Sequence, residues 1–212
     1  MIRIINLEID IEKREKITKQ FDNYDLKYEL ITGVEGLKYE LTEEDLQYLK
    51  NVDYDIHIKK GAVGCHLSHI KLLKELCNSE EEYMLVSEDD IIIIEPEIKT
   101  IINNLLNKIN LENYSIIYLS SGQIKPDTQH ILQINDEYNL YDCKNRWFEQ
   151  GNRLYLVTKQ GARDLLNKYY NYKCERAIDW FYIDQSNNPV VLYPSLVFHS
   201  YESSSINSRG GH

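Results

Sequence analysis

Short apolar segments alternate with amphipathic helical segments along most of this chain, and this alternation constrains the fold more than any other feature of the sequence. Residues 64–76, for example, carry apolar side chains at helical spacing and lead into the apolar run 83–87. Strands that alternate with helices pack in layers around a central sheet that is mostly parallel. We therefore expect an α/β fold in which helices flank such a sheet.

The same patterns predict where the individual elements lie. Strands are expected at residues 2–7, 27–31, 83–87, 91–94, 115–119, 154–157, 190–193 and 196–198. Helices are expected at residues 9–22, 42–45, 64–76, 97–109 and 159–169. The stretches 50–60 and 121–152 look irregular, and the polar tail from about residue 203 is expected to be loose. Ligands bind such sheets at the carboxyl ends of the strands, so a site is expected at that edge.

Length and charge limit the function classes. The 212 residues fit a single domain that spans residues 1–212. The chain has 24 Lys and Arg against 34 Asp and Glu, a net charge of −10. This acidic balance repels nucleic-acid backbones, so no nucleic-acid partner is expected. The 17 tyrosines suit polar ligands such as sugars, although a bias towards Ile, Asn and Lys explains them as well.

The cysteines and the N-terminus bear on the cellular compartment. No C-x-x-C spacing occurs among the four cysteines, which are Cys65, Cys77, Cys143 and Cys174. We favour free thiols in a reducing compartment. The N-terminus lacks the apolar core of a signal peptide, and the aliphatic run 91–94 is too short to span a bilayer. We expect no transmembrane segment and a location in the cytoplasm or on the cytoplasmic membrane face.

Three consecutive acids, Glu88, Asp89 and Asp90, follow the predicted strand 83–87. They would lie at the carboxyl edge of the sheet, where their mutual repulsion raises at least one pKa unless a cation intervenes. Oxygen ligands of this kind suit Mg²⁺ or Mn²⁺, and the ion would let an acidic protein hold a diphosphate. Taken alone, the triplet fits a solvated turn between two strands equally well.

Two further acids and a histidine are candidates near the C-terminus. Asp179 and Asp184 lie in the aromatic segment 178–184, and burial among aromatic rings would suit a carboxyl to act as a base. The alternative is a helix cap for Asp179 and a surface charge for Asp184. His199 follows the apolar residues 196–198 and would either close a metal site or be a half-buried structural histidine.

The predicted helix 64–76 carries two more candidate features. His66 and His69 lie three residues apart and would share a face of this helix. No H-E-x-x-H pattern is present, so packing or capping explains them better than a zinc pair. Gly61 and Gly64 flank the start of the helix, where a free helix N-terminus would attract an anion.

In their order along the chain, these motifs resemble glycosyltransferase family 25, which includes bacterial lipooligosaccharide galactosyltransferases and the collagen galactosyltransferase domain. Residues 61–69 (GAVGCHLSH) match the family's Gly-x-x-Gly-Cys-x-x-Ser-His block. Residues 87–91 (SEDDI) match its Leu-Glu-Asp-Asp signature, with Ser87 in place of Leu. Weaker likenesses lie at residues 5–7, Arg14, 32–36, 151–162, Asp179, 193–196 and 205–206.

The resemblance implies a GT-A-like nucleotide-sugar-binding fold, a UDP-sugar donor and a divalent metal, Mn²⁺ or Mg²⁺. The implied reaction moves a sugar, galactose in the known members, to a hydroxyl of a glycan, lipooligosaccharide or protein acceptor with inversion. By likeness, the metal ligands would be Asp90 and His199, and the base would be Asp179, with Asp184 as second choice. The implied donor-binding residues are Asn6, Leu7, Arg14, Gly64, Ser68, Glu88 and Asp89.

Three other functions are compatible with the same residues. A relative that keeps the nucleotide-sugar site but has lost turnover would retain the motifs. Another divalent-metal phosphoester enzyme would use the same acids, and an interaction domain would carry them as surface charge. Ser87 and the short tail depart from the family pattern, and either departure would change the acceptor or reduce activity.

Overall fold

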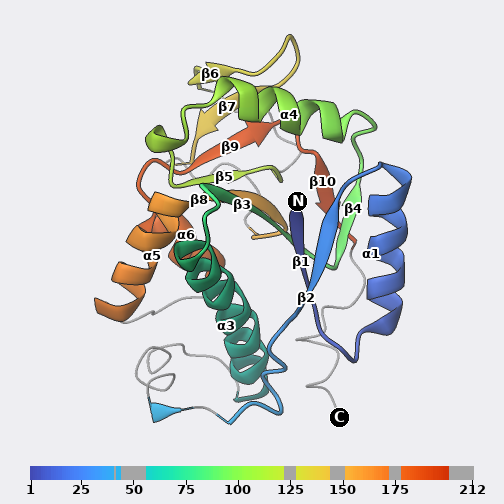
Figure 1. The fold of residues 1–212 in the computed structure, drawn as a ribbon, viewed down its shortest axis with the longest axis vertical. Coiled ribbons are helices and arrows are strands. Elements are labelled where there is room, and N and C mark those ends of the chain that lie inside the picture. The colour runs from blue at the N-terminus through green and yellow to red at the C-terminus, as the bar shows by residue number, and fades with distance from the viewer. Residues whose placement is uncertain (41, 44–55, 122–127, 144–150, 172–177, 201–212) are drawn as a thin grey trace.

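A computed structural model describes residues 1–40, 42–43, 56–121, 128–143, 151–171 and 178–200. Its central sheet has eight strands in the order β2-β1-β3-β8-β5-β9-β7-β6, and β10 pairs with β4 in a second, two-stranded sheet (Figure 1). The predicted tail from residue 203 lies outside the described residues, as does half of the predicted helix 42–45.

The predicted strands all have counterparts whose ends lie within one residue of the expected positions. The strands are β1 (Ile2–Asn6), β2 (Tyr28–Thr32), β3 (Tyr83–Glu88), β4 (Ile91–Ile93), β5 (Ile116–Tyr118), β6 (Leu132–Gln133), β7 (Asn139–Asp142), β8 (Leu154–Thr158), β9 (Val190–Tyr193) and β10 (Val197–His199). The helices are α1 (Ile11–Asn23), α3 (Ile56–Asn78), α4 (Ile98–Lys108), α5 (Lys159–Asn171) and α6 (Ile178–Gln185), with a 3₁₀ turn η1 (Leu111–Asn113).

Most strands of the central sheet run in the same direction. β1 is parallel to both β2 and β3, and β5 is parallel to β9. β8 is antiparallel to β3 and β5, and β7 is antiparallel to β9 and β6. Six of the eight strands therefore share one direction, and only β7 and β8 oppose it. The predicted α/β class with a central, mostly parallel sheet is confirmed.

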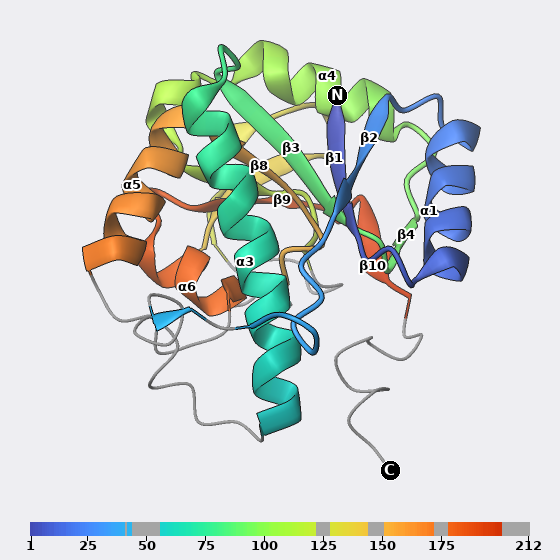
Figure 2. The same ribbon diagram turned by 60° about the horizontal axis from the view of Figure 1, so that its bottom comes forward.

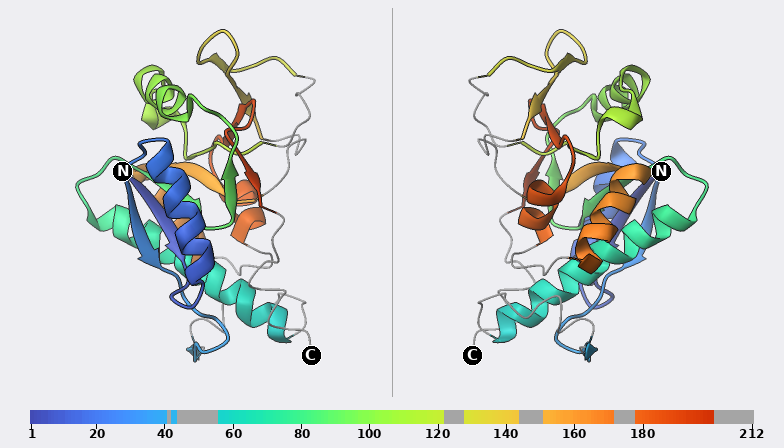
Figure 3. Two further views of the ribbon diagram at one scale, coloured as in Figure 1. Left: turned by 90° about the vertical axis from the view of Figure 1, so that its right-hand side faces the viewer. Right: turned by 90° about the vertical axis from the view of Figure 1, so that its left-hand side faces the viewer.

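Helices cover both faces of this sheet. On one face α3, α5 and α6 bury side chains such as Leu73, Leu165 and Phe181 against the strands. On the other face α1 and α4 bury Phe21 and Leu105 together with the β4–β10 pair. Figure 2 shows α3, α5 and α6 in front of the strands, and the two opposite views of Figure 3 bring α1 forward in one and α5 in the other. Each face therefore has its own apolar layer.

Helix α3 begins earlier than the sequence predicted. Residues 56–60 were expected to be irregular, but they form its first turns. No Gly or Pro interrupts residues 56–60, and extending a helix that is already packed costs little once its nucleus exists. The later turns are anchored in the apolar layer by residues such as Ile70 and Leu73.

Three other elements also escaped the sequence patterns. β6 and β7 lie within the stretch 121–152, which was predicted to be irregular, and β7 joins the sheet by pairing Leu140 with Leu192 of β9. A strand this short is decided by its distant partner and not by its own propensity. α6 buries residues on several sides, so it lacks the apolar stripe that marks an amphipathic helix.

Two further findings concern membranes and thiols. Within the described ranges, no helix combines the length and the apolar character that crossing a membrane requires. Cys65, Cys77 and Cys143 carry free thiols, and Cys174 lies outside the described residues.

Candidate functional site

A pocket of about 310 Å³ lies at the edge of the sheet where β1, β2 and β3 end. This is the edge at which the sequence analysis expected a site. Seven of the eleven residues assigned to a site from the sequence line this pocket: Leu7, Ser68, Glu88, Asp89, Asp90, Asp179 and His199. They come from the loop after β1, from the end of β3 and the loop that follows it, from helices α3 and α6, and from β10, so the fold gathers distant segments at one opening.

The acid triplet is held by partners from β1 and α1. The side-chain amide of Asn6 donates a hydrogen bond to Asp89 Oδ2 at 2.7 Å. Lys13 Nζ lies 3.9 Å from Asp89 Oδ1 and 3.9 Å from Asp90 Oδ2, so one ammonium group faces both carboxylates. Burial raises the pKa of Asp89 to about 6, although Asn6 and Lys13 favour its ionised form. The Asp89 carboxyl therefore titrates close to neutral pH.

Asp90 and His199, the two predicted metal ligands, lie side by side. His199 Nε2 is 3.4 Å from Asp90 Oδ2, and the pairing of β10 with β4 brings His199 opposite Ile91. Asp90 Oδ1 is buried and has no hydrogen-bond partner in the part of the chain that the structure describes. A buried carboxylate oxygen without a partner is costly, and a bound cation would remove that cost. The carboxylate and imidazole therefore fit a divalent ion such as Mn²⁺ or Mg²⁺.

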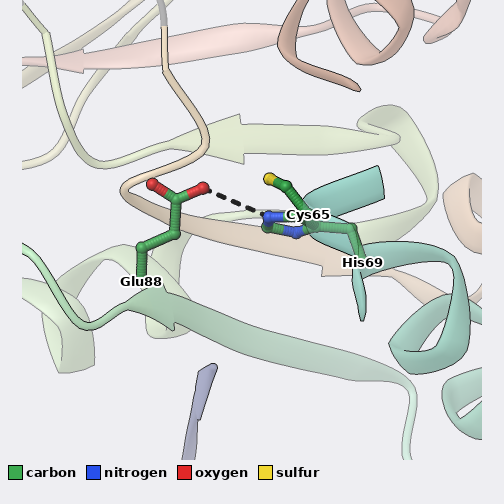
Figure 4. A group of neighbouring side chains, drawn as sticks. All are labelled: Cys65, His69 and Glu88. Atoms are coloured by element: carbon green, nitrogen blue, oxygen red, sulfur yellow. Dashed lines mark hydrogen bonds and ion pairs between the residues drawn. The ribbon is translucent and has the colours of Figure 1, made fainter. Parts of the chain in front are cut away.

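Glu88, the first acid of the triplet, faces a buried histidine (Figure 4). His69 Nε2 lies 3.2 Å from Glu88 Oε1, and His69 Nδ1 lies 2.8 Å from the hydroxyl of Tyr155. Burial lowers the pKa of His69 to about 4, so its ring is neutral. Burial, reinforced by the charge of Asp90, raises the pKa of Glu88 to about 8. His69 packs in the core as the sequence predicted, but it also contacts the site, which the sequence analysis missed.

The two candidate bases differ in position. Asp179 lies near the start of α6 and lines the pocket, whereas Asp184 on the same helix is exposed and is not among the lining residues. Burial raises the pKa of Asp179 to about 6, and the charge of Glu88 acts in the same direction. Of the two, Asp179 is the one placed to reach a group bound in the pocket.

Two predicted donor-binding residues of α3 hold a loop in place. Ser68 Oγ accepts a hydrogen bond from the Val34 amide at 2.8 Å and donates one to the Gly64 carbonyl at 2.6 Å. A Cβ on Gly64 would lie 2.3 Å from the Val34 carbonyl oxygen and 2.6 Å from the Gly36 nitrogen. The loop after β2 therefore packs backbone to backbone against α3, and its residues 34–37 line the pocket.

Besides Asp184, three predicted residues are not among those that line the pocket: Asn6, Arg14 and Gly64. Asn6 donates to two residues of the lining, Asp89 and the Asp10 carbonyl, and Arg14 donates to the Glu8 carbonyl at 2.6 Å. Lys13, which sequence reasoning missed, lines the pocket in place of its neighbour Arg14. The helical spacing of Lys13 and the buried Ile17 would have shown that both lie on the inward side of α1.

Arg153 is the second cation that the sequence analysis did not single out. It comes just before β8, which runs antiparallel to β3 and so begins at the edge where β3 ends. Its charge lowers the pKa values of both Glu88 and Asp179, against the larger effect of their burial. Lys13 and Arg153 therefore both bring positive charge to an acidic pocket, which suits an anionic ligand.

The fold and its pocket therefore define an α/β protein with a small-molecule site at the carboxyl edge of its sheet. It belongs to glycosyltransferase family 25, because the sequence profile described as "Glycosyltransferase family 25 (LPS biosynthesis protein)" matches residues 1–185. The resemblance predicted from the motifs is confirmed.

Similar proteins include a glycosyltransferase 25 family member of Drosophila melanogaster, which is 27% identical over 172 residues that cover 78% of this chain and 27% of the relative. Procollagen galactosyltransferase 1-B of Xenopus laevis is 25% identical over 77% of this chain and 27% of its own length. Human procollagen galactosyltransferase 2 is 22% identical over 78% of this chain and 27% of its own length. This chain thus spans about a quarter of these relatives.

One solved structure covers most of the chain. It is the crystal structure of a glycosyltransferase involved in the glycosylation of the major capsid of PBCV-1, which is 9% identical and superimposes with a TM-score of 0.46. The superposition covers 96% of this chain and 93% of that structure.

Proposed function

We propose that this protein is a metal-dependent glycosyltransferase that moves galactose from a UDP-sugar to a hydroxyl of a glycan, lipooligosaccharide or protein acceptor, with inversion. The observation that carries the proposal is the meeting of the acid triplet, His199 and Asp179 in one pocket. The names of two relatives, both procollagen galactosyltransferases, support galactose as the sugar. The family's description as a lipopolysaccharide biosynthesis protein supports a glycan as acceptor.

Asp90 and His199 would hold the metal in this proposal. A bound divalent cation supplies Lewis-acid stabilisation of the departing diphosphate. Lys13 faces the same two carboxylates from α1 and brings a permanent positive charge close to the place where the diphosphate would lie. The net charge of −10 would otherwise oppose an anionic donor.

The other walls of the pocket suit the remainder of the donor. Leu7, Val34 and Leu37 bring apolar side chains to the lining, and the loop residues 34–37 also bring backbone polar groups and the carboxylate of Glu35. A pocket of about 310 Å³ with an apolar wall and a few polar groups has the size and composition typical of small-molecule sites. We assign the loop side of the pocket to the nucleoside and the Asp179 side to the sugar and the acceptor.

Asp179 is the proposed general base. A carboxyl with a pKa near 6 is ionised at neutral pH and still basic enough to accept a proton from a hydroxyl in the transition state. In the proposed step the acceptor oxygen forms a bond to the anomeric carbon while the bond from that carbon to the diphosphate oxygen breaks. The proton of the acceptor hydroxyl moves to Asp179. One displacement from the opposite face inverts the anomeric centre.

The decisive experiment is a thermal-shift titration of UDP with and without Mn²⁺ on the wild type, Asp90→Ala and Asp136→Ala. A ligand that binds only the folded state raises its stability. Asp136 is an exposed acid outside the pocket, so its variant controls for the loss of one charge. We expect stabilisation that requires Mn²⁺, persists in Asp136→Ala and disappears in Asp90→Ala.

Each alternative function predicts a different result in this experiment and its follow-up. A rise in stability without transfer from any UDP-sugar would identify a relative that has lost turnover. Hydrolysis of a phosphoester in the absence of a sugar donor would identify another metal-dependent enzyme. No rise in stability under any combination would contradict the proposal and leave the acids a structural role.

A further inference from the structure

One group of side chains in the pocket has the chemistry of a second, different kind of metal site. Cys65 and His69 are one helical turn apart on α3, and Glu88 ends β3 (Figure 4). One ligand atom of each, a sulfur, a nitrogen and an oxygen, lies within 4.8 Å of the other two. No sequence motif predicted this group, because Glu88 is remote from the helix along the chain.

The surroundings of this group meet the further requirements of a metal site. A ligating histidine is normally oriented by a hydrogen bond at its other ring nitrogen, and Tyr155 makes that bond to His69 Nδ1 at 2.8 Å. Cys65, His69 and Glu88 all line the pocket, so an ion has a path of entry. Ligand atoms around a tetrahedral ion are roughly 3.4 Å apart. His69 Nε2 and Glu88 Oε1 are already 3.2 Å apart, so the thiol of Cys65 needs to approach them by at most about 1.4 Å.

The ligand types select the ion. A thiolate and an imidazole favour Zn²⁺ and similar thiophilic cations, whereas Mn²⁺ and Mg²⁺ prefer oxygen ligands such as those of Asp90. Three protein ligands around a tetrahedral ion leave the fourth position open to the pocket.

We propose that Cys65, His69 and Glu88 bind a thiophilic divalent cation such as Zn²⁺, at a site separate from the Asp90–His199 pair. An ion bound there engages Glu88 and places positive charge in the wall that also holds Asp179. Zn²⁺ bound at this site is therefore expected to inhibit the reaction proposed for the pocket. The binding itself is independent of glycosyl transfer, so it is tested without measuring activity.

The test is a titration of the metal-free full chain with Co²⁺, which reports a bound thiolate by an intense sulfur-to-cobalt charge-transfer band. We expect one equivalent to produce the band and Zn²⁺ to abolish it by displacement. Cys65→Ser should lose the band and bind Zn²⁺ roughly tenfold or more weakly. Cys77→Ser is the matched control, because Cys77 lies on the same helix outside the pocket, and it should keep the band. Asp90→Ala should also keep it.

A second measurement uses only the wild type, in case Cys65→Ser does not fold. The chain is alkylated with iodoacetamide with and without Zn²⁺, and the labelled cysteines are identified by peptide mass spectrometry. Zn²⁺ should protect Cys65 and leave the labelling of Cys77 unchanged. The proposal is overturned if no thiolate band forms, if Cys65→Ser shows the same band as the wild type, or if Zn²⁺ does not protect Cys65.

Discussion

Lys13 shows how one residue sets the electrostatics of the candidate metal site. Its ammonium lies 3.9 Å from oxygens of both Asp89 and Asp90, so it competes with any cation that these acids would bind. Two like charges a few ångströms apart interact by several kcal/mol at an effective dielectric constant of about 20, before screening by salt. The side chain is only 15% exposed, so this screening is incomplete.

Replacing Lys13 by Gln should therefore strengthen the binding of Mn²⁺ by roughly threefold to tenfold at pH 8, where the acids are more fully ionised. Isothermal titration calorimetry with Mn²⁺ measures this change. Lys19→Gln removes the same charge from an exposed position six residues further along α1 and serves as the control. An unchanged or weaker affinity for Mn²⁺ in Lys13→Gln would show that the ammonium does not oppose the ion.

Asp179, the proposed base, carries a cost in stability. Its pKa is about 6 in the folded protein against 3.8 for the ordinary carboxyl, so the folded state holds the proton more tightly than the unfolded state. The stability from this group is complete below pH 3.8 and is lost as the pH rises through 6. Asp179→Asn, which stays neutral, should unfold at a higher temperature than the wild type at pH 7.5, by roughly 2–4 °C or more.

Differential scanning calorimetry in the presence of a chelator measures this stability difference, which should vanish near pH 4. The same variant should lose transferase activity, whereas Asp184→Asn should retain it, because Asp184 is exposed outside the pocket. In the wild type, kcat/KM should rise with pH through about 6. Full activity in Asp179→Asn would refute its role as the base.

At the scale of elements, the contact between α3 and the loop after β2 shapes one wall of the pocket. Gly36 and Gly64 let the two backbones approach so closely that a Cβ on Gly36 would lie 1.7 Å from the Lys60 carbonyl oxygen. Ser68 then fastens the loop through the Val34 amide. The Gly-x-x-Gly-Cys-x-x-Ser-His block thus encodes a helix that carries both a packing surface and pocket residues.

Gly64→Ala should push the loop away from α3, because the clash is with backbone atoms that no side-chain rotation can relieve. We expect a loss of about 1–3 kcal/mol in the free energy of unfolding and weaker binding of UDP. Gly161→Ala is the matched control, because Gly161 lies on α5 away from the pocket and its Cβ would lie 2.2 Å from the Ser115 carbonyl oxygen. Urea unfolding and UDP titration should show both variants destabilised but only Gly64→Ala impaired in binding.

For the molecule as a whole, the apolar layer between the sheet and helices α3, α5 and α6 buries a titratable group. His66 packs against the rings of Tyr169 and Phe181 at centroid distances of 5.1 and 6.0 Å. Burial lowers the pKa of His66 to about 3, so its ring is neutral in the folded state and gains a proton more readily on unfolding. The stability that the neutral ring of His66 contributes to the folded state is complete above pH 6.5 and is lost as the pH falls towards 3.

Acidification from pH 7 to pH 5 should accordingly remove about 1–2 kcal/mol of stability through His66. In His66→Phe, which keeps an aromatic ring in this layer, this part of the loss should be absent. Urea unfolding of both proteins at pH 8, 7, 6 and 5 measures it, and the difference at pH 8 reports the change in packing alone. Parallel curves for the two proteins across this range would contradict the prediction.

Much of the fold could be predicted because its signals are local. β3 and β8 are apolar runs whose bounds follow from neighbouring residues, and β3 ends at Glu88. β7 could not be predicted, because it is a strand through its pairing with β9 and β6. The same holds for the site. The acid triplet could be predicted because its three acids are adjacent in the sequence, whereas the contact of Glu88 with His69 could not, because it joins two separate elements.

The sequence by itself determined the α/β class, the family and the candidate acids, since each depends on the order and spacing of residues within one segment. Only the tertiary structure decided that Lys13 and not Arg14 lines the pocket, and that Asp179 lines it while Asp184 is exposed. The physical reason is that burying both faces of the sheet sets the rotation of each helix about its axis. That rotation, which one segment cannot reveal, selects which side chains face the pocket.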